Sequence, residues 1–150
     1  MLSPFLSDDC AVDRVMNGVV AGTTDQNGTG VNMAGYDGVL FIALLGALTA
    51  NQVTQLKAQQ SSDDGSSDTY ADIEGSQTAA MGDDDDNDML VLDIYRPEEG
   101  YVRPVLERGT ANAVIDGIIA IRYKARDLPI TQGARVIDHV KLADPVAGTA

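Results

Sequence analysis

The sequence predicts an all-β fold, built as a sandwich or a barrel. About eight short segments have the composition of strands, and turn-rich stretches separate them roughly every 8–12 residues. Glycine spacing argues against helices in the most apolar stretch, because each glycine inside a helix costs about 1 kcal/mol relative to alanine. No amphipathic segment of helical length lies between the strand candidates, and this argues against an alternating α/β fold.

The first two strand candidates are long. Residues 13–21 (DRVMNGVVA) form one, with Gly18 as the expected site of a bulge. Residues 22–30 are rich in Gly, Thr and Asn, and Asn27-Gly28 is a dipeptide that type I′ turns favour. The run from Val31 to Leu48 is almost continuously apolar, and its Val, Phe and Ile content favours a strand. We expect this run to form a central strand that is buried on both faces.

Shorter candidates follow in the middle of the chain. Residues 52–60 have strand length, and the serine- and aspartate-rich residues 61–68 are expected to form a turn. Residues 70–73 and 77–81 are two further short strand candidates. Residues 89–95 (MLVLDIY) have the composition of a well-defined strand.

The last two candidates lie on either side of a second turn-rich stretch. A turn at residues 96–100, which contains Pro97, leads into residues 101–107. The side chains of that segment alternate between the two faces of a strand, with Val102, Pro104 and Leu106 on one face. Because proline cannot donate to a sheet ladder, Pro104 predicts an edge position for this strand. Residues 113–124 form the final candidate, in which Gly117 is expected to mark a bulge.

Both ends of the chain depart from the strand pattern. Residues 1–11 mix Pro, Ser and Asp with a few apolar residues, which predicts an N-terminal arm. Residues 125–150 are interrupted by Pro and Gly yet keep scattered apolar side chains, which predicts an extended C-terminal arm that packs on its own or on a neighbouring subunit. The expected organisation is therefore one β-sandwich domain, residues 12–124, between two arms.

Composition and charge exclude several classes of function. The chain has 150 residues, of which 44% are hydrophobic, and its net charge of −13 comes from 23 acidic and 10 basic residues. This charge argues against nucleic-acid binding and against docking on an anionic membrane. The longest apolar run is too short to cross a bilayer, and we expect no signal peptide in the first residues.

The charge is unevenly distributed along the chain. Residues 1–95 contain 16 acidic and two basic residues, whereas residues 96–150 contain seven acidic and eight basic residues. One interpretation is a solvated acidic face that aids solubility. The other is polar self-association, in which the basic part of one subunit meets the acidic part of a neighbour.

The acidic loop at residues 83–88 (DDDDND) is the one stretch that resembles a metal site. Asp83, Asp85 and Asn87 have the spacing of the first three ligands of an EF-hand loop. The pattern then fails, because the sixth position is Asp88 instead of glycine and the twelfth is Ile94 instead of glutamate. We predict no cofactor and no metal site, and retain Asp83, Asp85 and Asn87 only as calcium candidates.

The sequence offers little catalytic equipment. The single cysteine, Cys10, excludes an internal disulfide, and His139 is the only histidine available to a Ser-His-Asp triad. No nucleophile elbow, phosphate-binding loop or dinucleotide-binding glycine motif is present. We therefore predict no catalytic residues and a protein that is not an enzyme.

Two stretches of the chain carry a resemblance to a known group of proteins. They are GYDGVLFIALLGALT at residues 35–49 and, above all, IYRPEEGYVRPVLERGTANAVIDGIIAIRY at residues 94–123. The region from Gly35 to Lys124, well over half of the chain, resembles small virion structural proteins that tailed bacteriophages and prophages encode near their capsid genes. Residues 1–11 and 125–150 lie outside the resemblance.

The resemblance implies a fold and a function. It implies a jelly-roll-like antiparallel β-sandwich that acts as a capsid cement, or decoration, protein. Such a protein binds the outer surface of the assembled major capsid protein shell and stabilises the shell by bridging capsomers. The expected partners are the phage major capsid protein and further copies of the chain, as a dimer or a trimer, with no nucleic acid and no membrane. The group supplies no catalytic residues.

Basic and aromatic residues of the second half are the candidates for contacts between subunits. The arginines would pair with carboxylates on the shell, or would instead offset the acidic loops within one subunit. The interface candidates are Arg96, Arg103, Arg108, Arg122, Arg126, Tyr95 and Tyr101.

Three other functions remain open at this point. The first is a neck or tail component of the virion with the same sandwich, which copy number would distinguish from a cement protein. The second is a glycan-binding adsorption module that uses exposed tyrosines. The third is a small hydrolase that uses clustered aspartates, for which loss of turnover in Asp83→Ala or Asp85→Ala would be the evidence.

Overall fold

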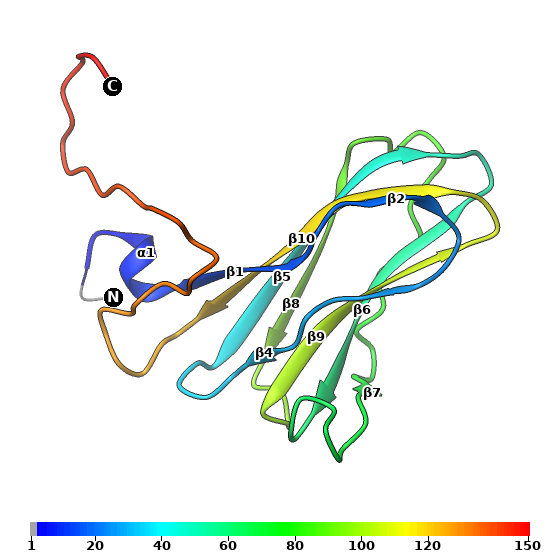
Figure 1. The fold of residues 1–150 in the computed structure, drawn as a ribbon, viewed down its shortest axis with the longest axis horizontal. Helices are drawn as coiled ribbons and strands as arrows, with labels where there is room; N and C mark the ends of the chain where they lie inside the picture. Colours follow the sequence, from blue (N-terminus) through cyan, green and yellow to red (C-terminus); the bar gives the residue numbers. More distant parts are fainter. Residues whose placement is uncertain (1–2) are drawn as a thin grey trace.

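The protein is a β-sandwich of two antiparallel five-stranded sheets (Figure 1). This is a computed structural model, and it describes residues 3–150. Within that range the one α-helix is α1 (Leu6–Asp9), a single turn. The all-β prediction is therefore confirmed, and of the two architectures it left open the chain adopts the sandwich.

The first sheet, which we call sheet A, contains the first and last strands of the chain. Its order is β1 (Ala11–Met16), β10 (Ala113–Tyr123), β5 (Gly38–Leu48) and β8 (Met89–Tyr95). The short strand β2 (Val19–Gly22) continues the line of β1 and also pairs with β10. β10 thus lies in the middle of the sheet, with β5 on one side and β1 and β2 on the other.

The second sheet, sheet B, contains the remaining strands. Its order is β3 (Gln26–Asn27), β9 (Tyr101–Gly109), β6 (Val53–Ser61) and β7 (Ala71–Asp72). The two-residue strand β4 (Val31–Asn32) pairs with β9 beside β3. Successive strands alternate between the sheets: β1 and β2 lie in sheet A, β3 and β4 in sheet B, β5 in A, β6 and β7 in B, β8 in A, β9 in B and β10 in A.

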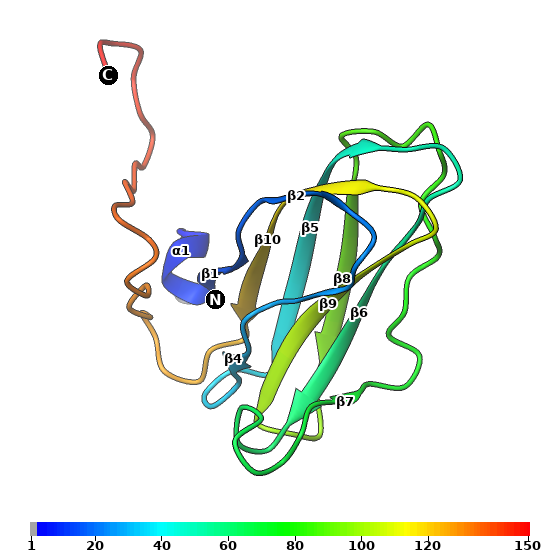
Figure 2. The ribbon, with the colours of Figure 1, turned by 45° about the vertical axis from the view of Figure 1, so that its right-hand side comes forward.

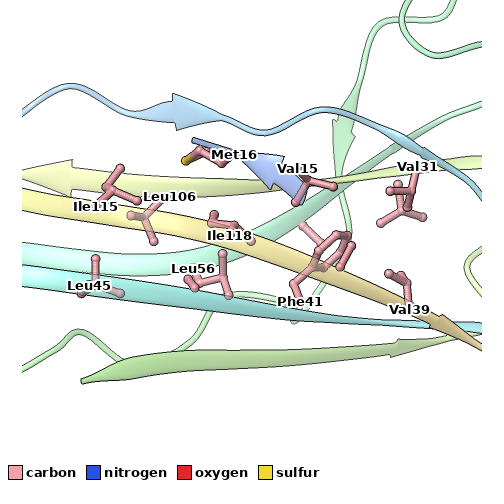
Figure 3. Packing of buried hydrophobic residues seen from close by; sticks show 14 of the residues in the cluster. Val15, Met16, Val31, Val39, Phe41, Leu45, Leu56, Leu106, Ile115 and Ile118 are labelled. Atoms are coloured by element: carbon pink, nitrogen blue, oxygen red, sulfur yellow. The ribbon is translucent and has the colours of Figure 1, made fainter. Parts of the chain in front are cut away.

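The core lies between the inner faces of the two sheets (Figure 3). In β5 the side chains of Val39, Phe41, Ala43 and Leu45 are buried, and the residues between them are more exposed except at glycines. This alternation is what a strand with one face in the core requires. Sheet B contributes Leu56 and Leu106 to the core. The other strands of sheet A add Ile115 and Ile118 from β10 and Val15 from β1.

The prediction that Val31–Leu48 forms one strand buried on both faces is wrong in two respects. The chain turns between β4 and β5, where Gly35 has a φ of 85° that favours glycine. In β5 the second face, formed by Leu40, Ile42 and Leu44, is partly exposed. An apolar run does not reveal whether its second face is covered, because periodicity reports side-chain polarity and not the neighbouring layer.

The edge position predicted from Pro104 is also wrong. β9 has β6 on one side and β3 and β4 on the other. On its β3 and β4 side, β9 has a gap in its ladder between these two short strands, and Pro104 lies at this gap. The Pro104 carbonyl oxygen accepts a hydrogen bond from the Gly28 amide at 2.8 Å. The next amide, of Thr29, donates to Val15 in sheet A. The missing N–H of proline therefore falls at a gap in the partner strand.

Three smaller predictions are corrected. Asn27 pairs with Val105 in β3, and neither Asn27 nor Gly28 has the positive φ that a type I′ turn requires. Residues 77–81 form no strand but run beside β6, where the amides of Thr78 and Met81 donate to its carbonyl groups. Gly18 separates β1 from β2 and does not form a bulge inside one strand.

Other strand predictions are confirmed. Residues 89–95 form β8 with the expected bounds, and β6, β9 and β10 match their predicted segments to within two residues. The register of β10 against β5 shifts between Ile115 and Gly117, as expected for a bulge at Gly117. Residues 70–73 contain the two-residue strand β7.

Residues 124–150, which we call the C-terminal segment, contain no helix or strand. In Figure 2, as in Figure 1, this segment passes α1 and its end lies away from the sandwich.

Candidate interaction surface

The outer face of sheet A, turned away from the core, is aliphatic. Residues that pair directly across antiparallel strands share a face, and Ile42 pairs with both Ile119 and Val91. These three side chains form the central row of a patch that crosses four strands. We call this patch the aliphatic face; its members are Val12, Leu40, Ile42, Leu44, Met89, Val91, Ile119 and Ile121.

The aliphatic face is uncovered. Met89 is 57% exposed and Val91 is 51% exposed, and the members on β5 and β10 are partly exposed. Isolated apolar side chains are common on protein surfaces, but contiguous apolar patches mark sites where another molecule binds. The arrangement of these residues in adjacent rows places this patch in the second class.

The outer face of sheet B is different, because its polar side chains are paired with one another. Lys57 Nζ lies 2.9 Å from Glu107 Oε1 and 3.0 Å from Asp72 Oδ2. The Arg103 guanidinium donates twice to Gln59 Oε1, at 2.9 and 2.7 Å. This sheet therefore has one face in the core and a solvated polar face, the usual arrangement of an antiparallel sheet. The aliphatic outer face of sheet A is the exception.

Two tyrosines close one end of the aliphatic face. The Tyr123 hydroxyl donates to Asp93 Oδ1 at 2.6 Å, and its ring lies over Gly38, where a Cβ would overlap it. Burial, and then the hydrogen bond to Asp93, raise the pKa of Tyr123 to about 12. Tyr95, which pairs with Gly38 from the other side, is exposed, and its ring has cations of Arg96 and Lys124 at 5.1 and 4.9 Å from its centroid.

The two side edges of the aliphatic face differ in charge. At the β1 edge, Arg14 and Arg135 line a groove of about 350 Å³ whose other walls include Leu44, Ile119 and Val136. At the β8 edge, Asp93 lies on the strand and Asp88 immediately precedes it, and both are exposed. We call these the basic edge and the acidic edge. Asp116 also lines the groove.

The first part of the C-terminal segment is fastened to the N-terminal residues. Gln132 Oε1 accepts from the Val12 amide at 2.9 Å, and Gln132 Nε2 donates to the carbonyl oxygens of Ser7 and Cys10 at 2.9 and 2.8 Å. The Ile130 amide donates to the Asp8 carbonyl oxygen at 2.9 Å. These contacts bring the chain to the basic edge of the aliphatic face.

Beyond Val136 the segment exposes apolar side chains. The exposed fractions are 92% for Ile137, 76% for Val140, 67% for Leu142 and 91% for Val146. The one side-chain anchor that the structure shows between residues 137 and 150 is the ion pair of Lys141 Nζ with Asp8 Oδ1 at 3.0 Å. When a partner covers exposed aliphatic side chains, apolar surface is removed from water, and this favours binding.

Three predicted interface arginines are engaged within the subunit. Arg108 is 5% exposed and donates to the carbonyl oxygens of Thr24, Val20 and Ala113, so it is not a surface residue. Burial lowers its pKa. Arg122 pairs with Asp13 at 3.0 Å, and Arg103 is held by Gln59.

The other two arginines are exposed at one end of the sandwich. Arg96 and Arg126 both line a cleft of about 560 Å³, together with Glu98 and Glu99 of the 96–100 turn. Arg126 makes one ion pair, with Asp37 at 3.2 Å. Arg96 and Arg126 are thus brought together, whereas Arg103 and Arg108 lie elsewhere. Of the two tyrosine candidates, Tyr95 is exposed and Tyr101 is partly buried, with its hydroxyl accepting from Asn32.

The acidic loop uses its carboxylates to hold backbone amides. Asp83 Oδ1 accepts from the Asn51 amide at 2.9 Å, Asp85 Oδ2 from Gly82 at 2.7 Å, and Asp86 Oδ1 from Leu48 at 2.6 Å. Among residues 3–150 no group of three or more His, Cys, Asp and Glu side chains is arranged to hold a metal ion. The loop residues therefore act in the structure as caps for neighbouring strand ends.

The aliphatic face is the feature that sequence reasoning missed. The signal is present in β8, where apolar residues occupy both faces of the strand, although the pattern by itself predicts only a strand. Cys10 is buried, and burial is the main cause that raises the pKa of its thiol. His139 is exposed on the C-terminal segment.

Comparisons with known proteins add no assignment. No family model matches the chain, and no curated protein matches it. Across residues 3–150 none of the helices is both long and apolar enough to span a membrane.

Proposed function

We propose that this protein is a structural subunit of a bacteriophage virion, a capsid cement protein that binds the outer surface of the major capsid protein shell. The observation that carries the proposal is the aliphatic face, which a lone subunit leaves uncovered together with the apolar side chains at residues 137–146. A subunit that exposes two such surfaces is suited to a larger assembly. The phage resemblance of residues 35–124 supplies the kind of assembly.

The strand order supports a jelly-roll relationship. Each sheet has its strands in the order expected of a double Greek key, with β1, β10, β5 and β8 in one sheet and β3 and β4, β9, β6 and β7 in the other. Jelly rolls are common among viral capsid domains, so this order supports a virion role by analogy of fold.

The contact with the shell is proposed to use the exposed arginine pair. Arg96 and Arg126 share the cleft at one end of the sandwich, and both side chains are exposed to carboxylates of a capsid subunit. The N-terminal residues and the C-terminal segment serve in the proposal as arms that reach neighbouring capsomers, and several weak contacts of one subunit strengthen one another through effective concentration.

The experiment is the copy number of the chain in purified virions, measured by quantitative mass spectrometry against the major capsid protein. A ratio near one to one supports a cement protein on the capsid lattice. A ratio of a few per cent moves the chain to the neck or tail. Absence from virions overturns the proposal.

Glycan binding is the weaker alternative because the tyrosines do not form a platform. Tyr70 and Tyr123 donate their hydroxyls to Asp64 and Asp93, and the Tyr36 ring packs against the Arg122 guanidinium at 4.6 Å. Tyr95 is the most exposed of the five, and cations of Arg96 and Lys124 lie against its ring.

A further inference from the structure

We propose that the aliphatic face is the surface on which a second copy of this chain docks, so that two sheets A pack face to face around a two-fold axis. The inference rests on the proposed function only in treating this face as an assembly surface. It names the partner that covers the face, and it concerns the isolated protein, without any capsid.

The chemistry of the face fits a copy of itself. Two sheets pack face to face when both present aliphatic side chains, about 10 Å apart, and this is how the two sheets of the subunit already meet. The row of Ile119, Ile42 and Val91 lies in the middle of the patch, where a two-fold axis brings it against the same row of the partner. A two-fold contact uses the same surface of both copies, so this surface must be complementary to itself. The aliphatic face is such a surface.

Charge selects the direction of the axis. A two-fold axis parallel to the strands places the basic edge of one copy, with Arg14 and Arg135, opposite the acidic edge of the other, with Asp88 and Asp93. An axis perpendicular to the strands places like charges opposite each other, which is unfavourable. The parallel axis also agrees in part with the uneven distribution of charge along the chain, because Arg135 of the second part lies opposite acidic residues of the first.

The C-terminal segment adds to the same contact. It reaches the basic edge of the aliphatic face at Arg135 and Val136, and the exposed Ile137, Val140 and Leu142 follow directly. In the parallel arrangement the acidic edge of the partner lies next to this point. The exposed side chains of residues 137–146 are then placed to pack against the partner's sheet A.

The combined surface has the size that a stable dimer needs. The aliphatic face with its charged edges and residues 137–146 amount to roughly 20 residues on each copy, near the about 20–30 residues a side of a standard interface. The face alone is smaller than that range. This is a reason for expecting both elements to take part.

The experiment measures the mass of the full chain in solution by sedimentation velocity over a range of concentrations. The expected result is a reversible dimer. The variant Ile42→Asp buries an unpaired charge in the centre of the contact and should weaken dimerisation by at least roughly thirtyfold. Val53→Asp is the matched control, because Val53 is a strand residue, 42% exposed, on the outer face of sheet B; it should leave dimerisation unchanged.

A charge exchange tests the orientation. Arg14→Glu alone and Asp93→Arg alone should each weaken the dimer by several-fold, and the double variant Arg14→Glu/Asp93→Arg should recover most of the loss. Circular dichroism and thermal unfolding of each variant establish that the sandwich is intact. A variant that fails to fold is replaced by Ile42→Lys or Met89→Lys on the same face.

Two results overturn the proposal. One is a monomer at every concentration tested, up to about the millimolar range in which even weak self-association becomes visible. The other is a dimer that Ile42→Asp, Ile42→Lys and Met89→Lys leave intact. Neither result bears on virion copy number, so failure here is distinguishable from failure of the proposed function. A dimer in solution of a chain that is absent from virions would support only the present inference.

Discussion

Arg108 Nη1 donates to the carbonyl oxygen of Ala113 at 2.7 Å, and this hydrogen bond joins sheet B to sheet A. The same guanidinium also donates to the carbonyl oxygens of Val20 and Thr24. One buried side chain therefore satisfies three backbone carbonyl groups at one end of the sandwich. Arg108 therefore stabilises the fold from a buried position within the subunit.

The variant Arg108→Met should be strongly destabilising. It leaves the buried Ala113 carbonyl oxygen and the part-buried Val20 and Thr24 carbonyl oxygens without their donor, and the expected loss is about 2–3 kcal/mol in the free energy of unfolding. Urea unfolding followed by circular dichroism measures it. Arg126→Met is the matched control, since the Arg126 side chain is 69% exposed with one ion pair, and its loss should be below about 0.5 kcal/mol. Equal losses in the two variants would contradict this account of Arg108.

Gly28→Ala should also destabilise the sandwich. A Cβ at this position would lie 2.6 Å from Pro104 Cγ and 2.9 Å from Pro104 Cδ, so β9 and the chain after β3 must move apart. Overpacking of this kind costs about 1–3 kcal/mol. Gly109→Ala is the control, because nothing lies within 4 Å of its Cβ position. Thermal unfolding of both variants is the measurement, and an unchanged melting temperature for Gly28→Ala would refute the predicted clash.

Tyr123 should make the protein less stable at high pH. Its pKa is raised from 10.0 to about 12, first by burial and then by the hydrogen bond to Asp93. Between these values the unfolded chain has lost the phenolic proton while the folded chain keeps it, so the free energy of unfolding falls as the pH rises. Below pH 10 the contribution is complete, because both states are protonated.

The test compares Tyr123→Phe with the unaltered protein in urea unfolding from about pH 9 to about pH 12. The variant loses the hydrogen bond and about 1 kcal/mol near pH 9, and its stability should fall less steeply above pH 10. Parallel pH dependences of the two proteins would show that Tyr123 does not titrate in this way.

The two parts of the C-terminal segment should respond differently to change. Gln132→Ala removes three hydrogen bonds to Ser7, Cys10 and Val12 and should cost about 1–3 kcal/mol. Removal of residues 137–150 should change the free energy of unfolding of the monomer by less than about 0.5 kcal/mol, because their side chains are exposed. Urea unfolding at low protein concentration measures both. A large loss on truncation would show that these residues pack on their own subunit.

The sequence was most informative where one local signal decides the structure. MLVLDIY between an acidic loop and a proline-containing turn predicted β8 correctly, because β propensity and turn chemistry agree there. Gly117 predicted a bulge for the same kind of reason. The edge prediction from Pro104 fails because proline requires only the absence of one hydrogen bond, and a gap inside a sheet provides this as well as an edge does.

Properties that depend on the other layer were out of reach. The sequence places Arg103 and Arg122 in strand candidates and Arg96 in a turn, but only the folded structure shows which guanidinium groups are paired or buried and which are exposed. The aliphatic face was hidden for a related reason. Val39 and Leu40 are equally apolar, and only the second sheet decides that Val39 is buried while Leu40 remains partly exposed.

The place of β10 in the middle of sheet A has a consequence for biosynthesis. A growing polypeptide that ends before residue 113 has no strand to join β1 to β5, so sheet A is incomplete at that stage of synthesis. Pairing of β1 with β10 also closes a loop of almost the whole domain, and such distant contacts form slowly. We expect folding to begin only after β10 has emerged, and until then the apolar segments of the nascent chain are open to aggregation and to capture by chaperones.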